Sequence, residues 1–251
     1  MTTHRILIIG ATSAMAEHCA RLWANRAAAD TLTLILVGRD LSRLERVAAD
    51  LRVRAPKVRV ESIESNFAKP EAIRATIDAI HAQGRVDIAL IAHGLLPDQA
   101  QCQQDLTACA EALEVNGLSP VLFAEAIAGH MEKANHGTLA IIGSVAGDRG
   151  RKSNYVYGAA KGLVSRYAQG LQHRLAGTQV KVVLIKPGPT DTPMTAHLKG
   201  GAKLAPVSTV AATIVKAIDA GKPTVYAPGK WLIIMHVIRH LPAFVFNKMN
   251  I

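Results

Sequence analysis

A tyrosine and a lysine four residues apart, Tyr157 and Lys161, form the pair in this sequence with the clearest chemical potential. On a helix, residues at this spacing share one face, so both side chains can point into the same cleft. A nearby ammonium stabilises a phenolate and lowers the pKa of a tyrosine from about 10, which suits Tyr157 to proton donation near neutral pH. Ser144 lies upstream and supplies a hydroxyl that can bind the same carbonyl oxygen. Such pairs also occur by chance on solvated helices, so the interpretation depends on the rest of the chain.

Seven apolar runs suited to buried parallel strands alternate with helical patterns along the chain. The predicted strands are 5–10, 32–38, 58–63, 86–92, 137–143, 180–186 and 224–226, and the predicted helices are 14–26, 41–53, 70–83, 106–133, 155–175 and 207–220. This alternation of helices with near-continuously apolar strands indicates a parallel sheet covered on both faces. With right-handed crossovers, the sequence predicts a single doubly wound α/β domain of the Rossmann type with about seven strands. We expect this domain to span residues 1–228 and an apolar, basic extension to span 229–251.

Length and cysteine content restrict the classes to which the protein can belong. A chain of 251 residues can bury one full core without dividing. Cys19, Cys102 and Cys109 are too scattered for a disulfide framework or a zinc site, so we expect no metal. Residues 1–5 lead directly into an apolar strand rather than into a signal peptide, which favours a cytoplasmic protein.

The formal net charge of +10 calls for an anionic partner. The sequence contains no zinc-finger, RNA-recognition or basic-helix signature and has few aromatic residues, which argues against nucleic acid. Cofactor phosphates and an acidic membrane surface explain the charge more economically.

The turn after the first predicted strand can hold a cofactor pyrophosphate. Residues 10–16 read Gly-Ala-Thr-Ser-Ala-Met-Ala and lead directly into a predicted helix, whose first amides can bind phosphate. Gly10 supplies the tight turn, while Ala14 and Ala16 stand where a strict fingerprint carries glycine. An ordinary strand–helix turn would also explain this segment.

The tip of the second predicted strand bears on the choice between NADP and NAD. An acidic residue there would bind the ribose 2′-hydroxyl of NAD, whereas an arginine favours the 2′-phosphate of NADP. Arg39 follows Gly38 at the tip, so we expect NADP. Asp40 keeps NAD possible, because it can be the acidic residue displaced by one position. Arg39 can also be a solvated loop arginine.

Over roughly residues 5–228 the sequence resembles the short-chain dehydrogenase/reductase family. The resemblance rests on a series of motifs in one order and at characteristic spacings: Gly10 with its loop, Ala92-His93-Gly94, Asn116, Ser144, Tyr157 with Lys161, and the segment 187–194. It implies an NAD(P)-dependent oxidoreductase that transfers a hydride between nicotinamide and a carbonyl or secondary alcohol.

The resemblance also implies a role for each of four catalytic residues. Tyr157 would be the general acid in reduction and the base in oxidation, and Lys161 would lower its pKa and bind the nicotinamide ribose. Ser144 would hold the carbonyl oxygen of the substrate. Asn116 would support a proton relay through water to Lys161.

Cofactor contacts follow from the same resemblance. Thr192 would contact the nicotinamide carboxamide, beside a wall shaped by Pro187 and Gly188. Asn66 would back the adenine ring, where the family more often has aspartate. His93 replaces a family asparagine, and we expect a structural role for it. The complete predicted cofactor-binding set is Gly10, Thr12, Ser13, Ala14, Met15, Arg39, Asn66, Ala92, Gly94, Tyr157, Lys161, Pro187, Gly188, Thr190 and Thr192.

Residues 231–251 are strongly apolar but carry basic side chains and are interrupted at Pro242. This segment is too interrupted to span a membrane, and it resembles two short amphipathic segments that can lie in a membrane interface. Packing on its own domain, or across an oligomer interface, is the alternative. We expect residues 195–205 to form a mobile lid. Lid and tail together favour a lipophilic or lipid-linked substrate, and the overall pattern is similar to short-chain reductases of polyprenyl-phosphate-linked 2-keto-pentose sugars.

The sequence therefore predicts an NADP-dependent carbonyl reductase or alcohol dehydrogenase in the cytoplasm, with peripheral contact at the inner face of the membrane through 231–251. The alternative is a non-catalytic Rossmann protein that binds NADP or docks at a membrane. An extended epimerase or dehydratase would need a larger C-terminal domain. We expect a homodimer or homotetramer, with the predicted helices 106–133 and 155–175 at the interface.

Overall fold

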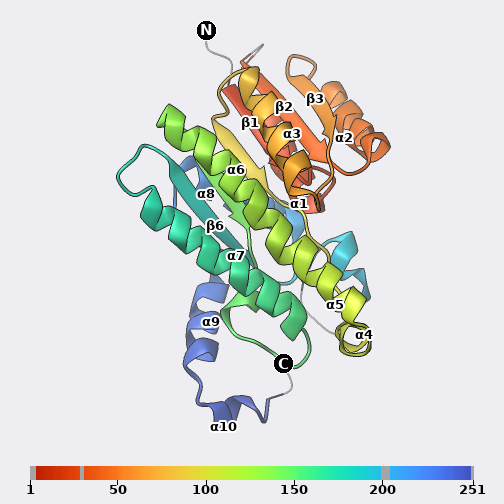
Figure 1. Cartoon of the computed structure of the whole chain (residues 1–251), viewed down its shortest axis with the longest axis vertical. Coiled ribbons are helices and arrows are strands. Elements are labelled where there is room, and N and C mark those ends of the chain that lie inside the picture. Colours follow the sequence, from red (N-terminus) through yellow and green to blue (C-terminus); the bar gives the residue numbers. More distant parts are fainter. Residues whose placement is uncertain (1–3, 29–30, 199–203, 250–251) are drawn as a thin grey trace.

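A seven-stranded parallel sheet forms the centre of the computed structural model, which describes residues 4–28, 31–198 and 204–249 (Figure 1). The strands lie in the order β3-β2-β1-β4-β5-β6-β9. Their bounds are β1 (His4–Ile9), β2 (Leu32–Gly38), β3 (Arg59–Glu64), β4 (Ile88–Ile91), β5 (Thr138–Ile142), β6 (Lys181–Pro187) and β9 (Thr224–Ala227). All seven predicted strands are present, and the order reverses beside β1 as in a doubly wound Rossmann-type fold. The predicted fold class is confirmed.

Each face of the sheet buries its own hydrophobic core. In β1, Ile6 and Ile8 belong to one core and Leu7 and Ile9 to the other, because successive side chains of a strand point to opposite faces. The first core is covered by α1 (Ala14–Arg26), α2 (Leu41–Arg54) and α8 (Val207–Asp219), and the second by α3 (Pro70–Ala82), α6 (Ser119–Ala134) and α7 (Tyr155–Arg174). Helices on both faces leave the carboxyl ends of the strands as the place for a ligand.

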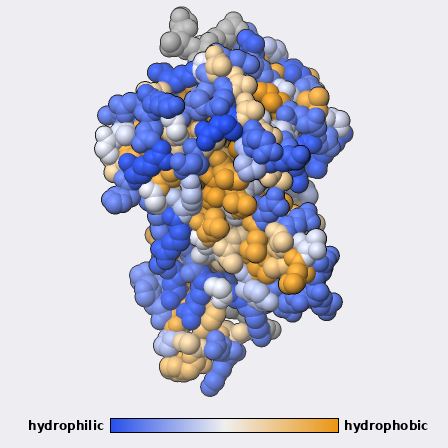
Figure 2. All heavy atoms as spheres, in the orientation of Figure 1, coloured by the Kyte–Doolittle hydropathy of each residue, from blue (hydrophilic) through white to orange (hydrophobic). Residues whose placement is uncertain are grey.

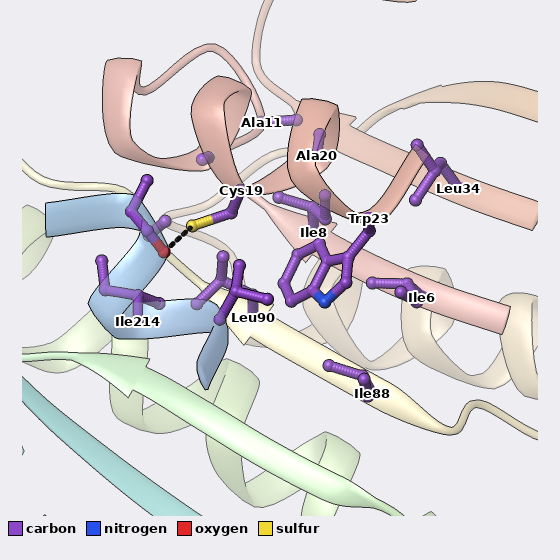
Figure 3. Close-up of a cluster of buried hydrophobic side chains, with 14 of the residues drawn as sticks. Ile6, Ile8, Ala11, Cys19, Ala20, Trp23, Leu34, Ile88, Leu90 and Ile214 are labelled. Carbon is purple, nitrogen blue, oxygen red and sulfur yellow. Dashed lines mark hydrogen bonds between the residues drawn. The ribbon is translucent and has the colours of Figure 1, made fainter. Parts of the chain in front are cut away.

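Figure 3 shows how α1 and α8 close the first core against the sheet. Trp23 and Cys19 of α1 lie beside Ile8 of β1 and near Ile214 of α8. The Cys19 thiol donates a hydrogen bond of 3.9 Å to the carbonyl oxygen of Ala211, which joins the two helices directly. Burial raises the pKa of Cys19 to about 12, so this thiol is a packing group and not a nucleophile.

The segment predicted as one helix over 106–133 is divided in the structure. It comprises α5 (Leu106–Leu113), a π-helical turn η1 (Glu114–Leu118) and α6, and a short α4 (Gln99–Gln104) precedes it. The side chains of Asp98 and Asp105 accept hydrogen bonds from backbone amides at the starts of α4 and α5, so two capping residues set these boundaries. The π-helical turn contains buried Asn116, and such turns occur frequently at functional sites.

The chain after β6 contains the segment predicted as a lid, 195–205, with short elements around it, and then the C-terminal helices. The short strands β7 (Thr190–Asp191) and β8 (Ala205–Pro206) pair with each other, and a 3-10 helix η3 (Pro193–Leu198) follows β7. Of the predicted lid, residues 199–203 lie outside the described residues. Beyond β9, α9 (Lys230–His240) and α10 (Ala243–Phe246) lie on either side of the predicted break at Pro242, and α10 forms one end of the molecule (Figure 1). Among the helices that the structure describes, none is long and apolar enough to cross a bilayer.

Candidate active site

The four predicted catalytic residues lie at the carboxyl edge of the central strands. Ser144 follows the end of β5, Asn116 lies in η1, and Tyr157 and Lys161 lie in the first turns of α7. The Nζ atom of Lys161 is 5.8 Å from the centroid of the Tyr157 ring, and the Tyr157 hydroxyl shares a hydrogen bond with Ser144. The structure therefore brings serine, tyrosine and lysine into one group.

Two glycines let the serine turn approach α7 closely. Ser144 caps a 3-10 turn, η2 (Val145–Asp148), and its Oγ accepts a hydrogen bond of 3.1 Å from the amide of Ala146. A Cβ atom at Gly147 would lie only 2.6 Å from the backbone of Lys161, and one at Gly158 would lie 3.0 Å from the carbonyl oxygen of Ala146. Larger residues at these positions would force the turn away from the helix, so glycine fixes the approach of Ser144 to α7.

Lys161 is buried, and Tyr157 is partly buried. The side chain of Lys161 is buried, and its ammonium donates a hydrogen bond of 3.2 Å to the carbonyl oxygen of Ile142. Burial lowers the pKa of Lys161 to about 8. Burial also raises the pKa of Tyr157, against an opposing effect of its hydrogen bond with Ser144. The expected lowering of the tyrosine pKa is thus not found in this structure, because burial outweighs the hydrogen bond with Ser144.

The amide of Asn116 braces the loop after β4. Its Oδ1 accepts a hydrogen bond of 2.9 Å from the amide of Leu95, and its Nδ2 donates one of 2.9 Å to the carbonyl oxygen of Ala112. A Cβ atom at Gly94 would lie 2.9 Å from Asn116 Oδ1 and 3.6 Å from Lys161 Nζ. Gly94 therefore gives both side chains room at the floor of the site.

A cleft of about 820 Å³ runs along this edge of the sheet. Its lining includes nine of the predicted cofactor residues, namely Gly10, Thr12, Ser13, Ala14, Met15, Arg39, Asn66, Gly94 and Thr192. Gly94 connects the cleft with the catalytic group, because Gly94 lines the cleft and also lies against Lys161. The size is that of a pocket for a cofactor or drug-sized ligand.

Gly10 is required by the backbone at the start of the loop. Its φ of +80° is a conformation that other residues rarely adopt, and a Cβ atom there would lie 2.6 Å from Cβ of His93. The amides of Gly10 and Ala11 are held by the carbonyl oxygen of Val37, which fixes the loop to the tip of β2. The following residues lead into α1 at Ala14, so the first amides of this helix face the cleft that Ser13 and Ala14 line.

Asp40 caps the start of α2. Its Oδ1 accepts hydrogen bonds of 3.0 Å from the amide of Arg43 and 2.9 Å from the hydroxyl of Ser42. These bonds hold the pKa of Asp40 below its ordinary value. Arg39 instead lines the cleft, as the NADP interpretation requires. The carboxylate of Glu64, at the end of β3, lines the same region.

Six residues in the predicted cofactor set do not line the cleft: Ala92, Tyr157, Lys161, Pro187, Gly188 and Thr190. The hydroxyl of Thr190 donates a hydrogen bond of 2.9 Å to the carbonyl oxygen of Gly188, so it stabilises the loop internally. Gly188 itself is covered by Trp231 of α9. Asn66 does line the cleft, but its Oδ1 accepts a hydrogen bond of 2.9 Å from the amide of Ala68.

His93 has the environment of a structural residue. Its Nε2 lies 3.0 Å from the Ser119 hydroxyl, and its ring packs edge-on against Phe67 and Phe123. Burial, with the nearby cations Lys161 and Arg39, lowers the pKa of His93 to about 3, so the ring is neutral at physiological pH.

Sequence reasoning missed several residues of the cleft, of which Arg43 is the most informative. It lies in the first turn of α2, four residues after Arg39, so two arginines line the end expected for the adenosine moiety. The spacing of four between two arginines around a capping aspartate was the available signal. Phe67, Ser119 and Met194 also line the cleft, and no pattern in the sequence marks them.

Comparison with known families assigns the chain to a class. The family model of short chain dehydrogenases matches residues 4–202. The chain belongs to the short-chain dehydrogenase family. The prediction that the protein is an NAD(P)-dependent oxidoreductase is confirmed by this family membership.

Relatives of this family member cover nearly its full length. An uncharacterised oxidoreductase of Streptomyces coelicolor is 30% identical over 245 residues, which are 97% of this chain and 95% of the relative. An uncharacterised oxidoreductase of Mycobacterium tuberculosis is 31% identical over 247 residues, 97% of this chain and 96% of the relative.

Solved structures share the fold of this short-chain dehydrogenase. A short-chain dehydrogenase from Sphingobium yanoikuyae in complex with NADPH superposes with a TM-score of 0.82 at 22% identity, covering 99% of this chain and 96% of the other. The bulky-bulky ketone specific alcohol dehydrogenase from Comamonas testosteroni gives a TM-score of 0.80 at 20% identity, with 100% and 96% covered.

Proposed function

We propose that the protein is an NADP-dependent carbonyl reductase or alcohol dehydrogenase whose substrate is lipophilic or lipid-linked. The observation that carries this proposal is the assembly of Ser144, Tyr157 and Lys161 beside the cleft that Arg39 lines. A protein that only binds a nucleotide has no need of this buried group.

NADP is the cofactor that the cleft fits. Arg39 and Arg43 can both bind a 2′-phosphate, and the capping role of Asp40 removes the carboxylate that would compete for a ribose hydroxyl. The related structure from Sphingobium yanoikuyae holds NADPH, which supports this choice.

The side chains at the site have complementary parts in the reaction. When bound, NADPH supplies the hydride. Tyr157 donates its proton to the carbonyl oxygen as that oxygen becomes an alcohol, and Lys161 stabilises the phenolate left behind. Ser144 Oγ accepts from the amide of Ala146, and its hydroxyl can donate a hydrogen bond to the same carbonyl oxygen in place of its bond with Tyr157. In the oxidative direction Tyr157 accepts the proton.

The C-terminal helices support a lipophilic substrate and peripheral contact with the inner face of a membrane. Ile233 of α9 and Phe244 of α10 are 71% and 72% exposed, and Leu232 and Val237 are exposed beside them. Figure 2 shows hydrophobic atoms gathered at the end of the molecule that α10 forms. The sequence after Asp219 contains no acidic residue, so this end combines apolar and basic side chains.

A tyrosine pair tests the proposed chemistry. Tyr157→Phe should bind NADPH like the unmodified protein but lose turnover of ketones by about 10²–10⁴-fold, because general acid catalysis contributes that much. Tyr155→Phe is the matched control and should keep its turnover, since Tyr155 is an exposed residue two positions away. Nicotinamide fluorescence measures binding, and loss of NADPH absorbance measures turnover. Tight NADPH binding without turnover of any ketone or alcohol would favour the non-catalytic alternative.

Vesicle flotation tests the membrane contact. The unmodified protein should float with vesicles rich in phosphatidylserine and dissociate at high salt. Ile233→Asp combined with Phe244→Asp should remain in solution, while Val53→Asp, a matched change of an exposed residue on α2, should float normally. Flotation of both variants alike would rule out this surface.

A further inference from the structure

The C-terminal helices contact both loops that frame the catalytic group. At the start of α9, the indole of Trp231 lies on Gly188, where a Cβ atom would be only 1.9 Å from its Nε1. Gly188 belongs to the loop after β6, which leads to Thr192 at the cleft. At its other end α9 packs against η2, the turn that begins at Ser144.

Arg149 makes the contact at that second end. Its Nη1 donates hydrogen bonds of 2.5 Å to the carbonyl oxygen of Ile238 and 2.7 Å to that of Leu241. These carbonyls lie at the C-terminus of α9, where the helix leaves acceptors unpaired and where a positive charge is favourable. The guanidinium also lies 3.8 Å above the ring of Phe246, in cation–π geometry. One arginine thus anchors both α9 and α10.

The neighbouring residue, Asp148, fixes the same turn to the sheet. Its carboxylate forms an ion pair with Lys186 of β6, and both side chains are almost fully buried, at 3% and 5% exposure. It also accepts a hydrogen bond of 2.7 Å from the hydroxyl of Tyr226 in β9. Ser144 begins the 3-10 turn η2, Asp148 is its last residue and Arg149 follows it directly, so the partners of Asp148 and Arg149 constrain the position of the serine.

We infer that α9 and α10 set the position of Ser144, with Arg149 as the positioning residue. This inference rests on the proposed function. Helix α9 spans the gap between the Gly188 loop and the Ser144 turn and keeps their separation constant. The carbonyl oxygen held by Ser144 and the nicotinamide beside Thr192 then keep the geometry that hydride transfer requires.

Arg149→Met tests the inference, with Arg26→Met as the matched control on the far side of the fold, where Arg26 forms an exposed ion pair with Asp219. The assay uses the full chain, NADPH and a water-soluble ketone without vesicles. Arg149→Met should lower kcat by about ten- to hundredfold, because small misplacements of a reacting group cost that much. The Kd for NADPH should stay within about twofold, and Arg26→Met should match the unmodified protein.

Repeating the Arg149→Met change in a Ser144→Ala protein distinguishes a positioning role of Arg149 from a purely structural one. In Ser144→Ala protein, Arg149→Met should cause no further loss of kcat, because the group through which it acts is already gone. Equal losses in the two backgrounds, or unchanged kcat with a lower melting temperature, would overturn the inference.

Phe246→Leu replaces Arg149→Met as the test if the Arg149→Met protein does not fold. Phe246→Leu removes only the cation–π contact and should lower kcat severalfold in the Ser144 protein and not in Ser144→Ala. Equal effects in both would overturn the inference. No turnover by the unmodified protein would instead overturn the proposed function, and this inference with it.

Discussion

The carboxylate of Asp40 decides how the tip of β2 can be used. From the sequence alone, an aspartate two positions past the strand can bind a ribose or cap the next helix, since both uses place it before a helix start. Its hydrogen bonds with Ser42 and the amide of Arg43 show that it caps. The cleft is therefore left with Arg39 and Arg43 as its nearby cations.

Removing these arginines should change cofactor preference. We expect Arg39→Ala and Arg43→Ala each to weaken NADPH binding by about ten- to hundredfold, because each would lose a hydrogen bond between charged groups. Binding of NADH should change little. Fluorescence titration with both nucleotides measures this, and Arg54→Ala, at the far end of α2, is the control. Equal losses for NADPH and NADH would contradict a 2′-phosphate contact.

The buried ammonium of Lys161 should set the alkaline limit of reduction. Its pKa near 8 means that it is protonated below that pH and loses its charge above it, whereas the pKa of Tyr157 is raised. We expect kcat/KM for NADPH, which reports the free enzyme, to decline above about pH 8. The Ser144→Ala protein should show the same decline of kcat/KM above about pH 8, at lower overall activity. A profile flat to about pH 9.5 would show that Lys161 stays charged.

At the scale of elements, the pattern of apolar residues was sufficient to predict the sheet but not the contacts among the loops that follow its strands. Strands such as β2 and β4 were predictable because they are apolar runs buried on both sides, whereas the edge strands β3 and β9 are only partly buried. The division of 106–133 was not, because the π-helical turn depends on Asn116 bonding to Leu95 from a distant loop. The same limit applies to Arg149 and Trp231, whose partners are distant in the sequence.

The outward faces of α6 and α7 are suited to subunit contact. Leu118, the last residue of η1 before α6, and Leu163 of α7 are 49% and 46% exposed, and Figure 2 shows hydrophobic residues across the middle of this face. Leu163→Arg should shift a dimer or tetramer toward monomer, because a charge in an apolar interface loses its hydration. Light scattering after size exclusion measures the mass. The control Val53→Arg, on α2, should leave the mass unchanged. A monomeric unmodified protein would contradict the expected dimer or tetramer.

At the scale of the whole molecule, neutral histidines make the fold sensitive to acid. Besides His93, His81 of α3 has its ring stacked 4.3 Å from that of His130 of α6. Burial lowers the pKa of His81 to about 4, against about 6.5 in an unfolded chain. Between these values the unfolded chain binds protons that the folded chain does not, so stability is complete above about pH 6.5 and declines as the pH falls.

Urea unfolding measures this dependence. The midpoint should be lower at pH 5 than at pH 7.5, with unchanged slope, and His81→Asn should reduce the difference by removing one of the two groups. Equal midpoints at both pH values would show that neither histidine resists protonation.

The place of α9 in chain order has a consequence for synthesis. Each of the strands β1 to β9 precedes it, so a nascent chain can complete the sheet before this helix has left the ribosome. Until then Gly188 lacks Trp231 and the carbonyl partners of Arg149 do not yet exist. A chain stopped shortly after β9 would carry every residue that performs the chemistry, yet without the helix that holds their loops in register.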